Sequence, residues 1–441
     1  MDDNGTNLAK PTAAQAAWQD LELGLMVGMD IGQFDMSEKA DGLSFGEAYP
    51  AKIFNPKKLD CDQWMEVCKL FGAKYTVMGS KAGSGFLQWQ TDAYDYGMRQ
   101  ATDFHDGKGD IVKEYVESSA KYGIKTGFYN CLHWNSYLGV VHNGKLGGGF
   151  IGKDTPEEKA HYAKQCEQML VELLTRYGEV TEMWFDGAYR VVEDGGPDLY
   201  GIFEKYGPDV MYFQANDWSS IRWCGNEDGC AGDPCWATVG STDAAMNDRT
   251  QATDGEAGGA TWLPPECDTM MPGRWWGWQG EEKMLAIEDP VDKLIEMYYN
   301  TVGRNANFLL ELVIGPDGLP FEPDIQYFER FGREIQRRFG TSLDETTGEG
   351  SEVTLELKQP AKIDHVIVME NILEGERIRE FVVEGLTPGN EWQTLCEGTS
   401  VGHKRILRFE STEVAQVRLK VTKQAATPKI RKLAVYDVAG N

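Results

Sequence analysis

The feature that most constrains the fold is an alternation of short apolar runs and amphipathic stretches from Trp18 to Arg338. A βαβα order of this kind favours a parallel sheet with crossover helices, and right-handed crossovers let a long series close on itself. A length of 441 residues leaves room for a second domain. We therefore predict an α/β fold, a (β/α)8-like (TIM-type) barrel followed by a smaller domain.

The expected elements of the barrel come in pairs. Strands are expected at 25–31, 72–78, 124–129 and 210–213 and in the apolar run before Asp186, and helices at 61–71, 111–122, 156–177, 199–206, 291–302 and 325–339. Residues 222–280 are rich in Gly, Pro, Trp and Asp and show little periodicity. We expect them to form long loops, which in compact domains usually serve a function.

The hydrophobic pattern of the sequence changes after Gly340, from alternating strands and helices to short strands only. Short alternating runs at 353–357, 363–369, 379–384, 392–395, 406–409 and 417–421 predict an antiparallel β-sandwich. The expected division is a tail at 1–17, the barrel at 18–340, a polar linker at 341–350 and the sandwich at 351–441.

The chain is strongly acidic, with 70 Asp and Glu against 43 Lys and Arg and a formal net charge of −27. This charge argues against nucleic acid or an anionic membrane as a partner. No apolar stretch approaches the roughly 20 residues that span a bilayer. The acidity fits a secreted or periplasmic bacterial protein, although no signal peptide is visible. The sequence does not indicate an oligomeric state.

The spacing of the cysteines indicates neither a disulfide framework nor a zinc site. The nine cysteines are irregularly spaced and include no CxxC pair, which argues against a disulfide framework and a structural zinc site. One local bridge among Cys224, Cys230, Cys235 and Cys267 remains an open alternative.

The run from Met183 to Ala188 carries the clearest chemical signal. It ends an apolar strand on Asp186, and the C-terminal strand ends of a parallel barrel form its active-site face. Asp186 is therefore a candidate nucleophile, with a simple loop cap as the alternative.

A carboxylate nucleophile is commonly paired with a second carboxyl group that gives and takes a proton. Glu227 is the candidate, because Trp223 beside it is expected to exclude water and raise its pKa. The alternative is a solvated loop residue.

Several motifs resemble one known family. Glu182-Met-Trp-Phe-Asp-Gly187 resembles the nucleophile region of glycoside hydrolase family 29, the α-L-fucosidases. The stretches 72–89 and 305–318 look like its second-strand and late-barrel motifs, and 222–227 looks like the acid/base loop of its linkage-strict branch. The resemblance implies a retaining double displacement that requires no metal or organic cofactor. A structural Ca²⁺ cannot be read from the sequence.

The resemblance and the residue types together nominate a sugar site. Glu266 is the rival acid, or else a ligand of a sugar hydroxyl, and Arg274 either contacts the sugar or pairs with Asp268 or Glu266. His133 can equally be structural. The candidate substrate-binding residues are Asp30, Gln33, Glu47, Lys81, Trp89, His133, Trp134, Trp223, Glu266 and Arg274.

Two positions depart from the family pattern. Where family members carry histidines that grip fucose, this chain has Gly28 and Ala82. Losing such hydrogen-bonding groups changes sugar discrimination. We therefore predict an exo-acting retaining α-L-glycosidase whose sugar need not be fucose, acting on an oligosaccharide or α-L-glycoside with terminal L-glucose or L-galactose. The alternatives are an ordinary α-L-fucosidase on fucosylated oligosaccharides and a non-catalytic carbohydrate-binding protein.

Overall fold

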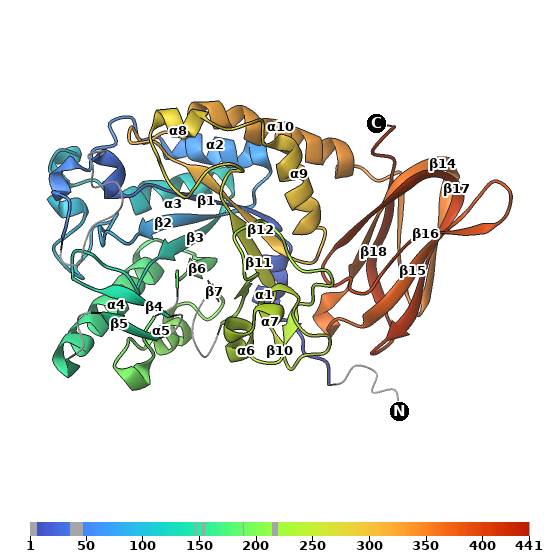
Figure 1. Cartoon of the computed structure of the whole chain (residues 1–441), viewed down its shortest axis with the longest axis horizontal. Helices are drawn as coiled ribbons and strands as arrows, with labels where there is room; N and C mark the ends of the chain where they lie inside the picture. The colour runs from blue at the N-terminus through green and yellow to red at the C-terminus, as the bar shows by residue number, and fades with distance from the viewer. Residues whose placement is uncertain are drawn as a thin grey trace.

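A computed structural model of the chain describes residues 7–35, 47–145, 148–151, 155–187, 189–213 and 219–440. It consists of a helix-covered barrel and, beside it, a C-terminal all-β domain (Figure 1). Among the described residues, no helix combines the length and apolar character that crossing a membrane requires.

The described part of the barrel is an eight-stranded sheet with the order β7-β6-β3-β2-β1-β12-β11-β8. All of its strand pairings are parallel. This nearly closed parallel sheet confirms the predicted TIM-type barrel. Its strands are β1 (Leu23–Gly28), β2 (Tyr75–Lys81), β3 (Lys125–Asn130), β6 (Glu182–Trp184), β7 (Met211–Phe213), β8 (Arg222–Trp223), β11 (Pro265–Thr269) and β12 (Asn307–Val313).

The helices lie outside this sheet (Figure 1). They are α1 (Ala13–Gln19), α2 (Cys61–Phe71), α3 (Ile111–Tyr122), α4 (Pro156–Arg176), α5 (Leu199–Tyr206), α6 (Thr242–Asn247), α7 (Arg249–Thr253), α8 (Glu281–Leu285), α9 (Val291–Asn300) and α10 (Glu322–Phe339). Local sequence explains the bounds of α2, since the Asp60 carboxylate accepts a hydrogen bond from the Gln63 N–H and Gly72 ends the helix with a φ of 91°. Asp110 and Gly123 bound α3 in the same way.

Short elements complete the barrel domain. Two small antiparallel pairs join β4 (Val141–Lys145) to β5 (Gly148–Ile151) and β9 (Thr238–Val239) to β10 (Thr261–Trp262). Single 3-10 turns occupy Ile31–Phe34, Ala51–Ile53, Met98–Gln100, His105–Gly107 and Val192–Asp194, and a further one, Ile372–Glu374, lies in the C-terminal domain.

The segment expected to be loops, 222–280, departs from the prediction. It contains the barrel strands β8 and β11 as well as α6 and α7. Strand β11 reads Pro-Glu-Cys-Asp-Thr and is buried along its whole length. Its carboxyl side chains face the barrel interior, so an apolar pattern could not reveal it.

The C-terminal domain confirms the predicted antiparallel sandwich. Its strands pair in the order β13-β18-β14-β17-β15-β16 around their own apolar core. They are β13 (Asp344–Glu349), β14 (Glu352–Glu370), β15 (Ile378–Leu386), β16 (Trp392–Gly398), β17 (Arg405–Gln424) and β18 (Lys429–Tyr436).

Two details of this domain differ from the sequence prediction. Strands β14 and β17 each unite two predicted strands, and register shifts such as that between Glu356 and Ala361 mark the breaks in their pairing. The expected linker 341–350 contains β13, which pairs with β18. A third difference concerns the N-terminal end of the chain. Residues 1–6 of the expected tail 1–17 lie outside the described residues, and the rest of the tail contains most of α1.

The two domains meet at the N-terminal ends of the barrel strands. Glu22, just before β1, accepts hydrogen bonds from His403 and Lys404, and Asn305, just before β12, accepts one from the His403 N–H at 2.6 Å. The sandwich therefore packs at the end of the barrel opposite the C-terminal strand ends, which supports a packing role for it.

Candidate active site

A cavity of about 790 Å³ opens at the C-terminal ends of the barrel strands. Ligand sites of this size, a few hundred to a thousand Å³, hold small molecules such as sugars. Strand ends and following loops from opposite sides of the barrel contribute to its wall. Of the predicted site residues, it is lined by Asp30, Gln33, Trp134, Asp186 and Glu227.

Asp186 follows β6 and lies half-buried in this wall. The Tyr129 hydroxyl, on the neighbouring strand β3, donates a hydrogen bond to Asp186 Oδ2 at 2.8 Å. Tyr129 also stacks on Trp184 at a centroid distance of 5.4 Å, and Trp184 stacks on Phe213 at 4.2 Å. This aromatic stack fixes the carboxylate and leaves its second oxygen for the cavity.

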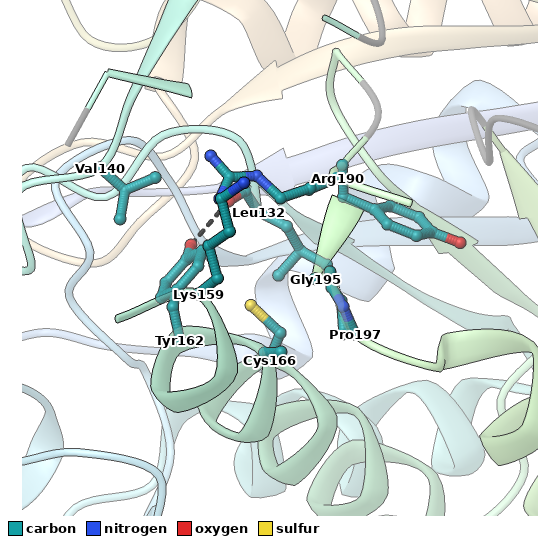
Figure 2. A pocket seen from close by; sticks show the side chains of 11 residues that line it. Leu132, Val140, Lys159, Tyr162, Cys166, Arg190, Gly195 and Pro197 are labelled. Atoms are coloured by element: carbon teal, nitrogen blue, oxygen red, sulfur yellow. Dashed lines mark hydrogen bonds between the residues drawn. The ribbon is translucent and has the colours of Figure 1, made fainter. Parts of the chain in front are cut away.

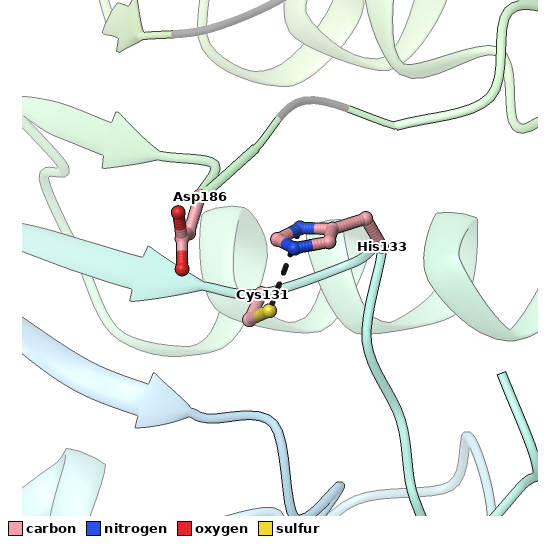
Figure 3. A group of neighbouring side chains, drawn as sticks. All are labelled: Cys131, His133 and Asp186. Carbon is pink, nitrogen blue, oxygen red and sulfur yellow. Dashed lines mark hydrogen bonds between the residues drawn. The ribbon is translucent and has the colours of Figure 1, made fainter. Parts of the chain in front are cut away.

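His133 closes the other side of Asp186. Its ring points toward the carboxylate, and its Nδ1 lies 3.6 Å from Cys131 Sγ (Figure 3). A side chain at Gly187, where φ is 66°, would place its Cβ 2.5 Å from the His133 ring. The glycine after the nucleophile candidate therefore permits this close packing.

The ligand atoms of Cys131, His133 and Asp186 lie within 4.8 Å of one another, a grouping that could hold a metal ion. However, burial raises the pKa of the Cys131 thiol to about 12, whereas metals bind the thiolate. The Asp186 carboxylate is also engaged by Tyr129. We therefore interpret the group as a packed wall of the site.

Hydrogen bonds from the barrel side fix the loop that carries His133. The Lys81 ammonium is fully buried and donates to the carbonyls of Cys131 and Trp134. On the outer side the Tyr162 hydroxyl donates to the Leu132 carbonyl at 2.6 Å (Figure 2). The hollow beside Tyr162 measures only about 20 Å³, room for little more than a water molecule.

Glu227 lies on the loop that follows β8 and lines the same cavity as Asp186. The Thr269 hydroxyl donates to the Glu227 carbonyl at 2.7 Å, which ties this loop to the end of β11. The side chain is exposed, and the Trp223 indole that was expected to shield it donates instead to Asp268 Oδ1 at 2.6 Å. The predicted desolvation of Glu227 by Trp223 is therefore wrong.

The rival acid Glu266 lies below the cavity. It is fully buried and accepts hydrogen bonds from the Tyr75 hydroxyl at 2.6 Å and the Trp184 indole at 3.0 Å. Burial, together with the nearby Glu182 carboxyl, raises the pKa of Glu266 well above its ordinary value. Burial likewise raises the pKa of Glu182 to about 7. Glu266 is thus placed to orient Trp184.

Sequence reasoning missed two acids of the cavity wall, Asp268 and Glu311. Burial raises the pKa of Asp268 well above its ordinary value and that of Glu311 to about 8. Strand periodicity offered a signal, because residues two apart on a strand share a face and Asp268 follows Glu266 by two. For Glu311 the signal was an acid inside an otherwise apolar strand.

The remaining wall is polar at depth and aromatic at the rim. Asp30 accepts a hydrogen bond from Ser84 at 2.6 Å, and burial raises its pKa. The Gln33 amide donates to the Ile314 carbonyl at 3.2 Å. Five indoles line the cavity, namely Trp134, Trp184, Trp275, Trp276 and Trp278, of which Trp275 is 64% exposed. Flat, accessible aromatic faces of this kind can stack on sugar rings.

Other predicted ligands lie outside the described lining. Trp89 is buried, and its indole donates to Glu172 at 2.7 Å. Arg274 pairs with Asp324 rather than with Asp268 or Glu266. Glu47 is exposed away from the lining. Trp89 and Arg274, like Lys81, contact partners that lie far away in the sequence and that the sequence alone could not reveal.

The cysteines form no disulfide, and all nine lie within the described residues. Cys224, Cys235 and Cys267 pack together in a small buried cluster. The local bridge considered from the sequence is therefore not formed.

A barrel whose C-terminal face gathers carboxyl groups, among them Asp186 and Glu227, and an aromatic rim around one cavity is typical of a glycoside hydrolase. Comparison with known proteins agrees. Residues 32–333 match the family model described as α-L-fucosidase. Alpha-L-fucosidase 1 of Arabidopsis thaliana is 29% identical over 97% of this chain and 88% of its own length.

Solved structures point the same way. A putative α-L-fucosidase from Bacteroides thetaiotaomicron VPI-5482 is 35% identical, with a TM-score of 0.89 over 98% of this chain and 99% of that one. A Ruminococcus gnavus fucosidase solved with fucose has a TM-score of 0.81 at 23% identity, over 99% and 98% of the two chains, and shares the fold. The chain therefore belongs to the α-L-fucosidase family, glycoside hydrolase family 29.

Proposed function

We propose that this protein is an exo-acting retaining α-L-glycosidase that removes a terminal α-L-sugar from an oligosaccharide or simple glycoside. The observation that carries the proposal is that Asp186 and Glu227, from different strand ends, line one cavity. The buried Trp184 and the strand β1 residue Met26 form part of the same wall toward the barrel core. A cavity that ends in the core suits the end of a sugar chain.

The reaction proceeds by double displacement. The free oxygen of Asp186 attacks the anomeric carbon while Glu227 gives its proton to the departing oxygen. Glu227 then takes a proton from water, which attacks the glycosyl–Asp186 ester and restores the carboxylate with net retention. The Tyr129 hydroxyl, which donates to Asp186 Oδ2, holds the carboxylate in one orientation through both steps.

The second part of the proposal concerns the sugar. None of the described residues that line the cavity is a histidine, because His133 packs behind the lining beside Asp186 and Cys131, and Gly28 and Ala82 stand in the cavity wall. The carboxyl groups of Asp30, Asp268 and Glu311 are among the polar groups of this wall. This set supports L-glucose or L-galactose as the preferred terminal sugar. The alternative, an ordinary α-L-fucosidase on fucosylated oligosaccharides, is supported by the family and by the names of the relatives.

A panel of p-nitrophenyl α-L-glycosides tests the sugar preference. We expect the α-L-glucoside or the α-L-galactoside to give a higher kcat/KM than the α-L-fucoside. A site that hydrogen-bonds a substrate hydroxyl with buried polar groups can reject the analogue that lacks this hydroxyl by a factor of about 10⁴ in kcat/KM. Initial rates on the gluco, galacto, fuco and rhamno compounds supply the measurement. A clear preference for the fucoside would establish the alternative.

Replacing Glu227 by alanine tests the acid/base assignment. We expect kcat/KM to fall about 10²–10⁴-fold on a disaccharide, whose leaving group needs a proton. On a 2,4-dinitrophenyl glycoside, whose leaving group needs none, the first step stays fast and the glycosyl-enzyme accumulates. Azide should then restore turnover and give a glycosyl azide of retained configuration.

The matched comparison is Glu266→Gln. Because Glu266 lies below the cavity among Tyr75 and Trp184, we expect this variant to lower the rates on both leaving groups alike and to gain nothing from azide. If Glu266→Gln instead shows the leaving-group dependence and Glu227→Ala does not, the two roles are exchanged.

A non-catalytic carbohydrate-binding role would not require the paired carboxyl groups. The secreted or periplasmic location expected from the sequence stays a proposal. The net charge of −27 supports it, whereas nine unpaired thiols make no use of an oxidising compartment.

A further inference from the structure

Glu311 is one of three acids of the cavity wall, with Asp30 and Asp268, that the proposed mechanism leaves unused. It lies on β12, opposite Met26 of β1 in the sheet register, and its side chain lines the cavity. In the strand order, β12 stands four places from β6, whose end carries Asp186. Four places are half the circumference of an eight-stranded barrel, so Glu311 faces the nucleophile from the far wall.

The two carboxyl oxygens of Glu311 have different environments. Oε1 accepts a hydrogen bond from the Gly277 N–H at 2.6 Å, which ties the tryptophan-rich loop 275–278 to the barrel. Oε2 is buried and has no hydrogen-bond partner among the described residues. Buried polar atoms are rarely left unpaired, so this oxygen requires an explanation.

The neighbouring charges do not provide the missing partner. Arg274 is the nearby cation, and its terminal nitrogens bind Asp324 and the Met284 carbonyl. Burial raises the pKa of Glu311 to about 8, opposed in part by Arg274. At neutral pH the group therefore largely keeps its proton and can donate as well as accept a hydrogen bond.

We infer that Glu311 is a specificity-determining residue whose Oε2 binds a hydroxyl on the C4–C6 edge of the terminal L-sugar. The inference rests on the proposed function. In a pyranose bound with its anomeric carbon at Asp186, the ring atom across from C1 is C4, and C6 is attached next to it. The wall across from the nucleophile thus meets the edge at which L-fucose, L-galactose and L-glucose differ.

The chemistry of the group then selects the substrate class. A C6 methyl against a buried carboxyl oxygen would leave that oxygen unpaired, whereas a C6 or equatorial C4 hydroxyl would satisfy it. Asp30, which follows the adjacent strand β1 and also lines the cavity, adds a second carboxyl to this wall. The preferred substrate is therefore an α-L-hexopyranoside with a hydroxyl at C6 or an equatorial hydroxyl at C4, neither of which L-fucose has.

Glu311→Gln is the decisive variant, because its amide oxygen can still accept from Gly277 while the second position becomes a pure donor. We expect kcat/KM on the preferred glycoside to fall about 10–100-fold. The galactoside-to-fucoside ratio, which isolates the C6 hydroxyl, or the glucoside-to-galactoside ratio, which isolates C4, should change at least about tenfold. Glu322→Gln, on the exposed start of α10, is the control and should leave both ratios unchanged.

Equilibrium binding separates this inference from the proposed function. Free L-galactose, L-glucose and L-fucose are titrated into the wild type and the variant, and thermal melting checks that both are folded. Selective weakening of one hydroxylated sugar supports the inference even if no glycoside is hydrolysed, an outcome that would defeat only the proposed reaction. Equal changes for all sugars and all glycosides would overturn the role of Glu311 while leaving the reaction intact.

Discussion

Replacing Asp186 by asparagine is expected to lower kcat on aryl α-L-glycosides by about 10⁴–10⁶-fold, as loss of a catalytic nucleophile does in other hydrolases. The amide has nearly the size of the carboxylate and keeps an oxygen that can accept from Tyr129. Fold and sugar binding should therefore survive while the covalent step is lost. Initial rates, together with sugar binding, give the measurement.

Azide provides the chemical signature of the missing nucleophile. In Asp186→Gly, where the truncated side chain leaves room for it, azide should attack the anomeric carbon directly and yield a glycosyl azide of inverted configuration, opposite to the product expected for Glu227→Ala. Asp194→Asn, an exposed acid after the same strand, serves as the control and should keep wild-type rates. Retention of more than about one-tenth of the activity in Asp186→Asn would exclude Asp186 as the nucleophile.

The sequence predicted best those elements whose signals are local. Helices α2, α3 and α5 were predicted with the bounds that the structure shows, because an aspartate cap precedes each and glycine follows it. Asp186 could be singled out because an apolar strand ends on it. The fold class was predicted from the repeated alternation of strands and helices. This prediction combines many local signals that are weak individually but agree with one another.

Elements and residues that depend on distant partners were not predictable. Strand β8 has only two residues and β11 is polar, so only the closure of the barrel around them makes them strands. Lys81 and Trp89 resembled sugar ligands, yet each is buried against a partner some 50 or 83 positions away. A sequence shows that a polar residue follows a strand, but the fold decides whether it meets substrate or another side chain.

Glu311 illustrates the opposite error, a residue of the cavity wall that the sequence prediction missed. After Asn307 its strand reads as apolar core apart from this one acid, and the residue was taken as part of the late-barrel motif. The acid cannot be solvated inside a barrel strand, so it must be paired, protonated or functional. A lone acid in the middle of an apolar strand is therefore in itself a sequence signal for a candidate site residue.

Arg274→Ala is expected to destabilise the barrel by about 3–5 kcal/mol, the usual cost of leaving one partner of a buried ion pair alone. The side chains of Arg274 and Asp324 are only 2% and 1% exposed. A second guanidinium bond, to Asp324 Oδ1 at 2.8 Å, makes the pair bidentate and joins the tryptophan loop to α10. Thermal unfolding should show a fall in melting temperature of roughly 5–10 °C.

Two comparisons make this result specific to the buried pair. Arg333→Ala removes an exposed partner of Glu329, with side chains 75% and 35% exposed, and should cost less than about 1 kcal/mol. The double change Arg274→Met with Asp324→Leu should recover most of the lost stability, because no charge is left buried alone. If Arg274 were instead a sugar ligand, as the sequence had also suggested, Arg274→Ala would raise KM at unchanged melting temperature. That outcome would contradict the structural role, since a bidentate pair shielded from water cannot be removed without cost to the fold.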